Sequence, residues 1–78
     1  MKLGINQIAL LRRCHLKGYI GIYDVSLYYP LKDGRKRIAI LEKLSLRGLL
    51  ETKNNRKWFL TDRGIETLKE NLRGSVNV

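Results

Sequence analysis

The sequence predicts a small, mainly helical α+β domain that carries one two-stranded hairpin. Three observations support this prediction: helical spacing of apolar residues in three long segments, two short β-prone runs around Asn54 and Asn55, and a length of 78 residues. A chain of this length has room for one modest core. We therefore expect residues 1–78 to form a single domain, with residues 73–78 as a loose tail.

The composition is typical of a folded domain with an anionic partner. Hydrophobic residues make up 44% of the chain, and 16 Lys and Arg against 7 Asp and Glu give a net charge of +9. Such a surplus favours a polyanion, with nucleic acid as the first candidate. The apolar stretches are far shorter than the roughly 20 residues that span a bilayer. No signal peptide is visible, because Gly4, Asn6 and Gln7 interrupt the N-terminal apolar run.

The cysteine, histidine and serine residues give no sign of a metal site or of catalysis. Cys14 is the single cysteine, which excludes an internal disulfide and suits a reducing cytoplasm. It adjoins the single histidine, His15, but structural zinc needs about four ligands. Ser26, Ser45 and Ser75 have no nearby histidine and acid partner in the sequence, and no phosphate-cradling glycine loop is present. We therefore expect a cytoplasmic protein without cofactor, metal or enzymatic activity.

A first helix is predicted from Ile5 to Lys17, with Gly18 after its end. Its broad apolar face, expected to meet the core, consists of Ile5, Ile8, Ala9, Leu11 and Leu16. A second, narrower stripe consists of Leu3, Leu10 and Cys14, with Gln7 inside it. A helix that is apolar on two sides often contacts a second subunit, so we interpret this stripe as a homodimer interface. A second core face against the last helix is the alternative.

The segment between the first and third helices is predicted to be short and irregular. Residues 18–22 alternate glycine with aromatic and β-branched residues, which indicates a short strand or an extended connector. Asp24 is expected to cap a brief second helix that runs from Tyr23 to Tyr29, where Pro30 stops it. Tyr28 and Tyr29 are predicted either to bind phosphates or to pack under the helices.

A third helix is predicted from Arg35 to Gly48, which acts as its C-terminal cap. Its apolar half contains Ile38, Ile40, Leu41 and Leu44. The opposite half is mostly cationic and contains Arg35, Lys36, Ala39, Glu42, Lys43 and Arg47. Arg37 lies on the apolar side near the start of the helix.

A hairpin and a last helix complete the predicted elements. Asn54 and Asn55 separate the runs 49–53 and 56–60 and predict a two-residue turn. This turn would pair Thr52 with Lys57 and Glu51 with Trp58, giving a cationic tip and an apolar base. Thr61 is then expected to cap a helix that runs to Leu72, with one narrow apolar stripe formed by Ile65, Leu68 and Leu72.

The order of these elements resembles the winged helix-turn-helix family, which has a three-helix core, a hairpin wing and a C-terminal helix. The resemblance rests on Ile38-x-x-Leu41-x-x-Leu44-x-x-x-Gly48-Leu49-Leu50, and on Trp58-Phe59-Leu60-Thr61-x-x-Gly64-x-x-x-Leu68 after the hairpin. The chain looks like the small stand-alone transcriptional regulators of archaea, bacteria and archaeal viruses. It departs from the family pattern in the second helix, which is short and ends at Pro30 without the usual small residue at its centre.

The resemblance implies sequence-specific binding of double-stranded DNA by a homodimeric transcriptional regulator that recognises a short palindrome. The 35–48 helix would enter the major groove, and the 53–57 wing would lie on the backbone or in the minor groove. The expected DNA-binding residues are Arg35, Lys36, Arg37, Ala39, Lys43, Lys53, Asn54, Asn55, Arg56 and Lys57. No small-molecule effector is evident. The alternative function is a winged-helix protein-interaction module in a larger assembly, and RNA binding ranks third.

Overall fold

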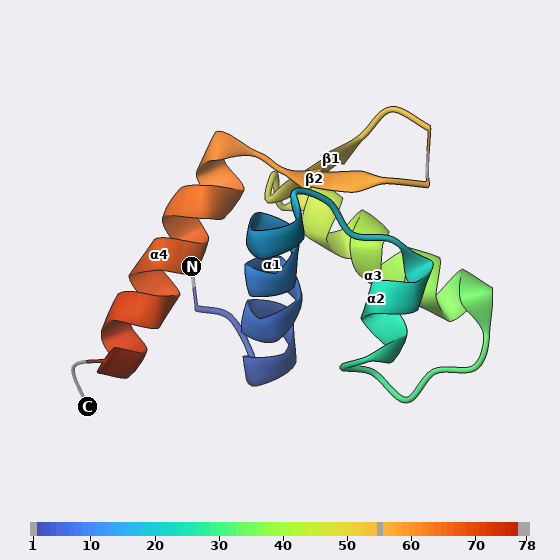
Figure 1. The fold of residues 1–78 in the computed structure, drawn as a ribbon, viewed down its shortest axis with the longest axis horizontal. Coiled ribbons are helices and arrows are strands. Elements are labelled where there is room, and N and C mark those ends of the chain that lie inside the picture. The colour runs from blue at the N-terminus through green and yellow to red at the C-terminus, as the bar shows by residue number, and fades with distance from the viewer. Residues whose placement is uncertain (1, 55, 77–78) are drawn as a thin grey trace.

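Four helices and one antiparallel hairpin form the part of the chain that the computed structural model describes, residues 2–54 and 56–76 (Figure 1). The elements are α1 (Ile5–Lys17), α2 (Ile22–Ser26), α3 (Gly34–Leu46), β1 (Leu50–Thr52), β2 (Trp58–Leu60) and α4 (Asp62–Val76). In Figure 1, α1 stands between α4 on one side and the α2–α3 pair on the other, with the hairpin across the top. The architecture is a winged helix, as the sequence predicts.

The core lies where α1 packs against α4, β2 and the α2–α3 pair. Leu10 and Leu11 of α1 are fully buried there, as are Leu41 of α3 and Leu49 before the hairpin. The predicted broad core face of α1 is wrong at its two ends, because Ile5 is 86% exposed and Leu16 is 74% exposed.

The apolar stripe that we interpreted as a dimer interface is a core face of the single chain. Leu3, Leu10 and Cys14 are 6%, 0% and 1% exposed, while Gln7 is half-buried. The stripe is covered because α1 packs against α4 and β2, and the N–H of Leu3 donates to Asn71 Oδ1 at 2.9 Å. These three side chains are thus buried within one chain, as expected for the alternative interpretation of a second core face against the last helix.

The first helix ends and the second begins within a few residues of their predicted limits. α1 ends before Gly18, whose φ of 95° is left-handed and whose N–H donates to the carbonyl of Cys14. Asp24 caps α2 from inside the helix, because its carboxylate accepts the N–H of Gly21 at 2.8 Å. The second helix is shorter than predicted and ends at Ser26.

The third helix confirms the prediction to within two residues at each end. Asp33 caps its start, since Asp33 Oδ1 accepts the N–H of Arg35 at 2.9 Å. Gly48 follows its end with a left-handed φ of 80°. The chain then enters β1 directly, so the end of α3 fixes the start of the hairpin.

The hairpin has a longer loop and a different register than predicted. Leu50 pairs with Leu60, Glu51 with Phe59 and Thr52 with Trp58. The predicted partner of Trp58 was Glu51, and that assignment is wrong because strand side chains alternate between two faces. Trp58 is 2% exposed and points inward, so its partner must also point inward. β1 therefore ends at Thr52 and β2 begins at Trp58, so the two strands are not joined in the register of the predicted two-residue turn, of which Asn55 lies outside the described residues.

The last helix begins as predicted but continues further. Thr61 Oγ1 accepts the N–H of Gly64 at 2.9 Å and donates to the carbonyl of Gly48 at 2.5 Å. Gly64 is required here, because a Cβ at this position would collide with the carbonyl oxygen of Leu49. α4 extends to Val76, so the predicted end at Leu72 and loose tail from residue 73 are wrong within the described residues. Residues 77 and 78 lie outside those residues.

Candidate nucleic-acid interface

The start of α3 presents the first group of predicted DNA-binding residues. Arg35, Lys36, Ala39 and Lys43 are all exposed on this helix. The Asp33 cap satisfies an N–H of the first turn, which fixes where the helix begins. Three cations and one small side chain thus share the exposed face of a helix that is anchored by its opposite, buried face.

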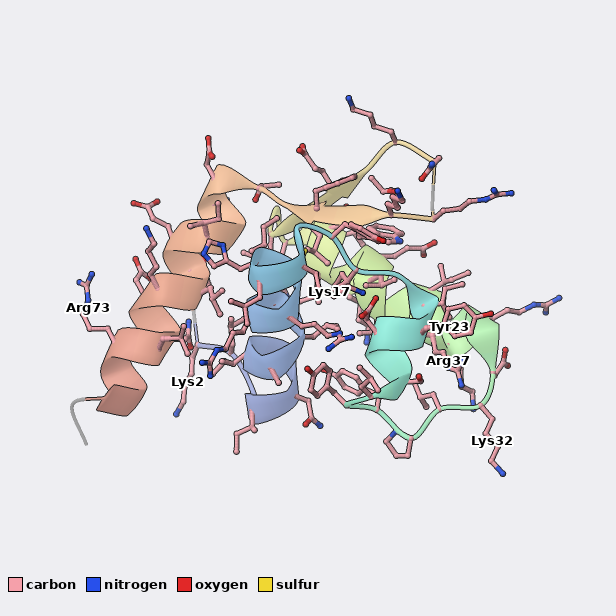
Figure 2. All side chains as sticks on the ribbon, viewed as in Figure 1. Lys2, Lys17, Tyr23, Lys32, Arg37 and Arg73 are labelled. Atoms are coloured by element: carbon pink, nitrogen blue, oxygen red, sulfur yellow. The ribbon has the colours of Figure 1, made fainter. Side chains whose placement is uncertain are left out.

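Arg37 has a different environment from its neighbours. It is half-buried, and its Nε donates to the carbonyl of Leu31 at 2.7 Å. This bond connects α3 to the loop that precedes it, and Figure 2 shows Arg37 close to that loop. Arg37 lies on the apolar side of the helix because its guanidinium binds the backbone of the loop between α2 and α3.

The wing tip presents the second group, consisting of Lys53, Asn54, Arg56 and Lys57, all of them exposed. Asn54 organises the loop, because its Oδ1 accepts the N–H of Arg56 at 3.0 Å and that of Lys57 at 3.2 Å. Thr52 Oγ1 donates to the carbonyl of Lys57 at 2.7 Å. The three cations thus project from a loop held by side-chain bonds. Asn55, the remaining predicted wing residue, lies outside the described residues.

A shallow hollow separates α3 from the wing, and its lining contains a carboxylate. The residues around it are Glu42, Ser45, Leu46, Thr52 and Trp58. Glu42 is exposed, so its charge would repel a phosphate placed between helix and wing. The cationic surface is therefore divided into a helix part and a wing part.

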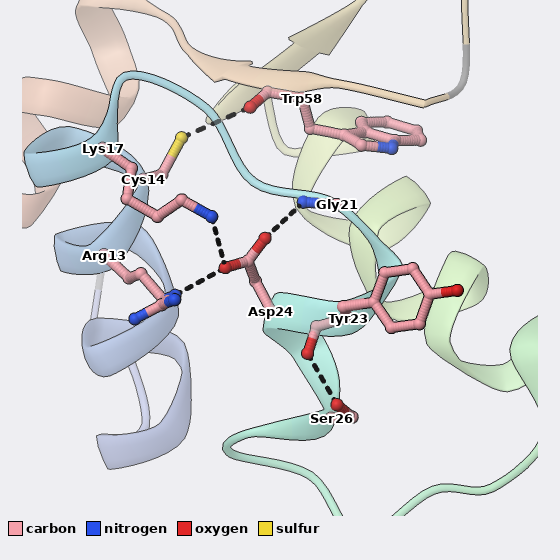
Figure 3. Close-up of polar contacts among 8 residues, drawn as sticks. All are labelled: Arg13, Cys14, Lys17, Gly21, Tyr23, Asp24, Ser26 and Trp58. Atoms are coloured by element: carbon pink, nitrogen blue, oxygen red, sulfur yellow. Dashed lines mark hydrogen bonds and ion pairs between the residues drawn. The ribbon is translucent and has the colours of Figure 1, made fainter.

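A buried ion cluster, which sequence reasoning missed, joins α1 to α2 (Figure 3). Asp24 is 6% exposed, and its Oδ1 accepts Arg13 Nε at 2.5 Å and Lys17 Nζ at 2.9 Å. Burial alone would raise the pKa of Asp24, but the bonds from Arg13, the Gly21 N–H and Lys17 outweigh it and hold that pKa below its usual value. No sequence pattern reveals the cluster, since it depends on how α1 and α2 meet.

Several aromatic and sulfur side chains are structural. Tyr28 and Tyr29 pack against the core, and burial raises the pKa of the Tyr29 hydroxyl. Their position favours the packing alternative over phosphate binding. Trp58 is a core residue and is 2% exposed. Burial raises the pKa of the Cys14 thiol to about 11, and Cys14 Sγ donates to the Trp58 carbonyl at 3.4 Å.

Within residues 2–54 and 56–76, no group of three or more His, Cys, Asp and Glu side chains is placed to hold a metal ion. In the same part of the chain, every helix is too short or too polar to cross a membrane.

Comparison with known proteins supports the fold. The structure is similar to that of BpsR from Bordetella bronchiseptica, a protein whose DNA binding is regulated by 6-hydroxynicotinic acid, with a TM-score of 0.74 and 24% sequence identity. The match covers 97% of this chain and 57% of BpsR, so the chain spans little more than half the length of that protein. No family model and no curated protein sequence matches the chain.

Proposed function

We propose that this domain binds double-stranded DNA sequence-specifically and acts as a transcriptional regulator. The observation that carries the proposal is the placement of two exposed cationic groups, at the start of α3 and at the tip of the wing, on one winged-helix scaffold. The helix would enter the major groove with Arg35, Lys36, Ala39 and Lys43, while Lys53, Arg56 and Lys57 would contact the flanking backbone or minor groove. The net charge of +9 and the fold shared with BpsR support this assignment.

Binding of duplex DNA by purified variants tests the proposal. The double variant Arg35→Ala/Lys36→Ala should lose about 1–3 kcal/mol of binding free energy per lost base contact, and should lose sequence preference as well. Arg56→Ala should weaken binding to all sequences alike and lower the salt slope by about one. Gel-shift titrations over a range of salt concentrations measure both effects.

The matched control for the double variant is Lys69→Ala/Arg73→Ala, which removes the same charge from exposed positions on α4. Figure 2 shows Arg73 at the end of the molecule away from the wing. Equal losses of DNA affinity in the two double variants would mean that only net charge matters. That result would contradict the assignment of the α3 surface to DNA binding.

We further propose that the regulator acts as a homodimer on a palindromic site, since dimers with two-fold symmetry bind half-sites one helical turn apart. The stripe of Leu3, Leu10 and Cys14 cannot form the interface, because it is buried within the chain. Exposed Ile5 and Leu16 leave apolar surface on the same helix. Selection of bound duplexes from a random pool tests this point, and recovery of single, unpaired half-sites would argue for a monomer.

A protein-interaction module is the second candidate, favoured by the exposure of Ile5 and Leu16 outside the α3 and wing surfaces. The two functions differ in one measurement. An interaction module would not bind duplex DNA at low salt with any sequence preference, whereas the proposed regulator would.

A further inference from the structure

A hollow under the wing extends from the predicted wing residues Arg56 and Lys57 onto α1 and α2. It has a volume of about 610 Å³ and opens between the end of α1, the start of α2 and the second half of the wing loop. Its walls approach closely, since a Cβ at Gly21 would lie 3.1 Å from the carbonyl oxygen of Arg56. In Figure 2, Lys17 and Tyr23 lie below the hairpin, with Lys17 between α1 and α2 and Tyr23 nearer the start of α3. We call this hollow the α1–wing cleft. Its charged and aromatic lining residues are Arg13, Lys17, Tyr19, Tyr23, Asp24, Arg56 and Lys57, and Ile22 and Leu27 add apolar side chains.

Positive charge accumulates in the α1–wing cleft. Its lining contains four cationic side chains and a single carboxylate, Asp24, which already pairs with both Arg13 and Lys17. Arg56 and Lys57 add their charges from the wing. Such an arrangement carries mutual repulsion, which an anion placed between the cations would relieve.

Two lysines from distant parts of the chain lie near one aromatic ring in the lining of this cleft. Lys17 Nζ of α1 lies 5.2 Å from the centroid of Tyr19, and Lys57 Nζ of the wing lies 4.7 Å from the same centroid. Both ammonium groups therefore contact the same ring, and both residues line the same hollow. Tyr23, which is 84% exposed, adds a hydroxyl that can donate to an anion at the rim.

We propose that the α1–wing cleft seats a phosphodiester of the DNA backbone between Lys17 and Lys57, with Tyr23 at its rim. This inference rests on the proposed function, because it extends the same DNA-binding surface from the wing onto α1 and α2. A cleft of about 610 Å³ is larger than a phosphate ion and leaves room for the flanking sugars. Contacts to phosphates carry no sequence information but fix the register of the protein on the duplex.

The Asp24 carboxylate positions this site. It holds Lys17 through a 2.9 Å bond and Arg13 through a second bond, and it joins α1 to the first turn of α2. Lys17 is thus held at the cleft before DNA arrives, which lowers the entropy lost on binding. Arg13 continues to neutralise Asp24 while Lys17 shares its charge with the phosphate.

Salt-dependent affinity for a bound duplex tests the proposal. Lys17→Ala should lower the affinity several-fold and reduce the slope of log Kd against log salt by about one, with sequence preference unchanged. Lys17→Arg should retain the wild-type slope, because it keeps the charge. Tyr23→Phe removes only an exposed hydroxyl and should give a smaller loss of affinity.

Arg73→Ala is the control, since it removes one exposed charge at the opposite end of the molecule. Thermal unfolding of each variant shows whether the fold is kept, and Tyr23→Phe tests the site even if Lys17→Ala unfolds. The proposal is overturned if folded Lys17→Ala matches Arg73→Ala, or if it weakens binding with an unchanged salt slope. Wild-type protein that binds no duplex would instead overturn the proposed function, and this inference with it.

Discussion

The two halves of this molecule are held together in different ways. Around α1, α4 and the base of the hairpin, apolar side chains such as Leu10, Leu11 and Trp58 are almost completely buried and fix the structure by packing. Around α2, the start of α3 and the wing tip, individual polar bonds from Asp24, Arg37 and Asn54 add to the packing, and many of the charged side chains are exposed. The packed half gives stability, and the polar half leaves cations exposed for a ligand.

The largest effect is expected in the packed half. Leu10→Ala should lower the free energy of unfolding by about 2–5 kcal/mol, because it removes a fully buried side chain from the core. Urea denaturation at several protein concentrations measures the loss. A loss that depends on protein concentration would show that Leu10 contacts a second subunit and would contradict its place in the core of one chain.

A smaller effect, with a pH dependence, is expected at the junction of the two halves. Asp24→Asn should cost on the order of 1–3 kcal/mol, because the bonds that Arg13, Lys17 and the Gly21 N–H make to a charged carboxylate are lost or weakened. The pKa of Asp24 is lower in the folded protein than in the unfolded chain. Its contribution is therefore present above about pH 4 and is lost as the pH falls through the folded pKa.

Denaturant unfolding of Asp24→Asn and wild type, measured from neutral pH down to about pH 2, gives the difference in their free energies of unfolding above and below the ordinary pKa of aspartate. The two curves should converge in acid. A difference in free energy of unfolding that stays constant at all pH values would mean that the charge of Asp24 does not contribute to stability.

The smallest change in stability distinguishes two neighbouring arginines in the polar half. Arg37→Ala should cost about 0.5–1.5 kcal/mol, because its bond to the Leu31 carbonyl is lost. Arg35→Ala should stay within about 0.5 kcal/mol of wild type, since Arg35 is exposed. Thermal unfolding of the two variants, together with their DNA affinities, separates a fastening role from a contacting one. Equal stabilities would contradict the structural role of Arg37.

The success of the sequence predictions follows the same division. The helix limits at Gly18, Gly48 and Thr61 were predictable, because each depends on a cap or stop signal within a few residues. The buried face of α1 was not, since this helix has apolar residues on two sides and only its packing against α4 and β2 selects between them.

Some features of the candidate site were likewise predictable from the sequence and others were not. The exposed cations of α3 and the wing followed from their positions in a recognisable order of elements. The register of the hairpin did not, because the Asn54–Asn55 pair favours a two-residue turn, while the buried position of Trp58 requires a longer loop. The α1–wing cleft could not be predicted, because Lys17 and Lys57 come to line one hollow only after α1, α2 and the wing have packed.

One backbone pairing limits how the wing can move. Ile20 and Trp58 exchange two hydrogen bonds, with Ile20 N donating to Trp58 O at 2.9 Å and Trp58 N donating to Ile20 O at 2.8 Å. This pairing holds the base of the wing against the connector between α1 and α2. If this pairing opened, the Ile20 and Trp58 amides would be exposed to hydrogen exchange in concert.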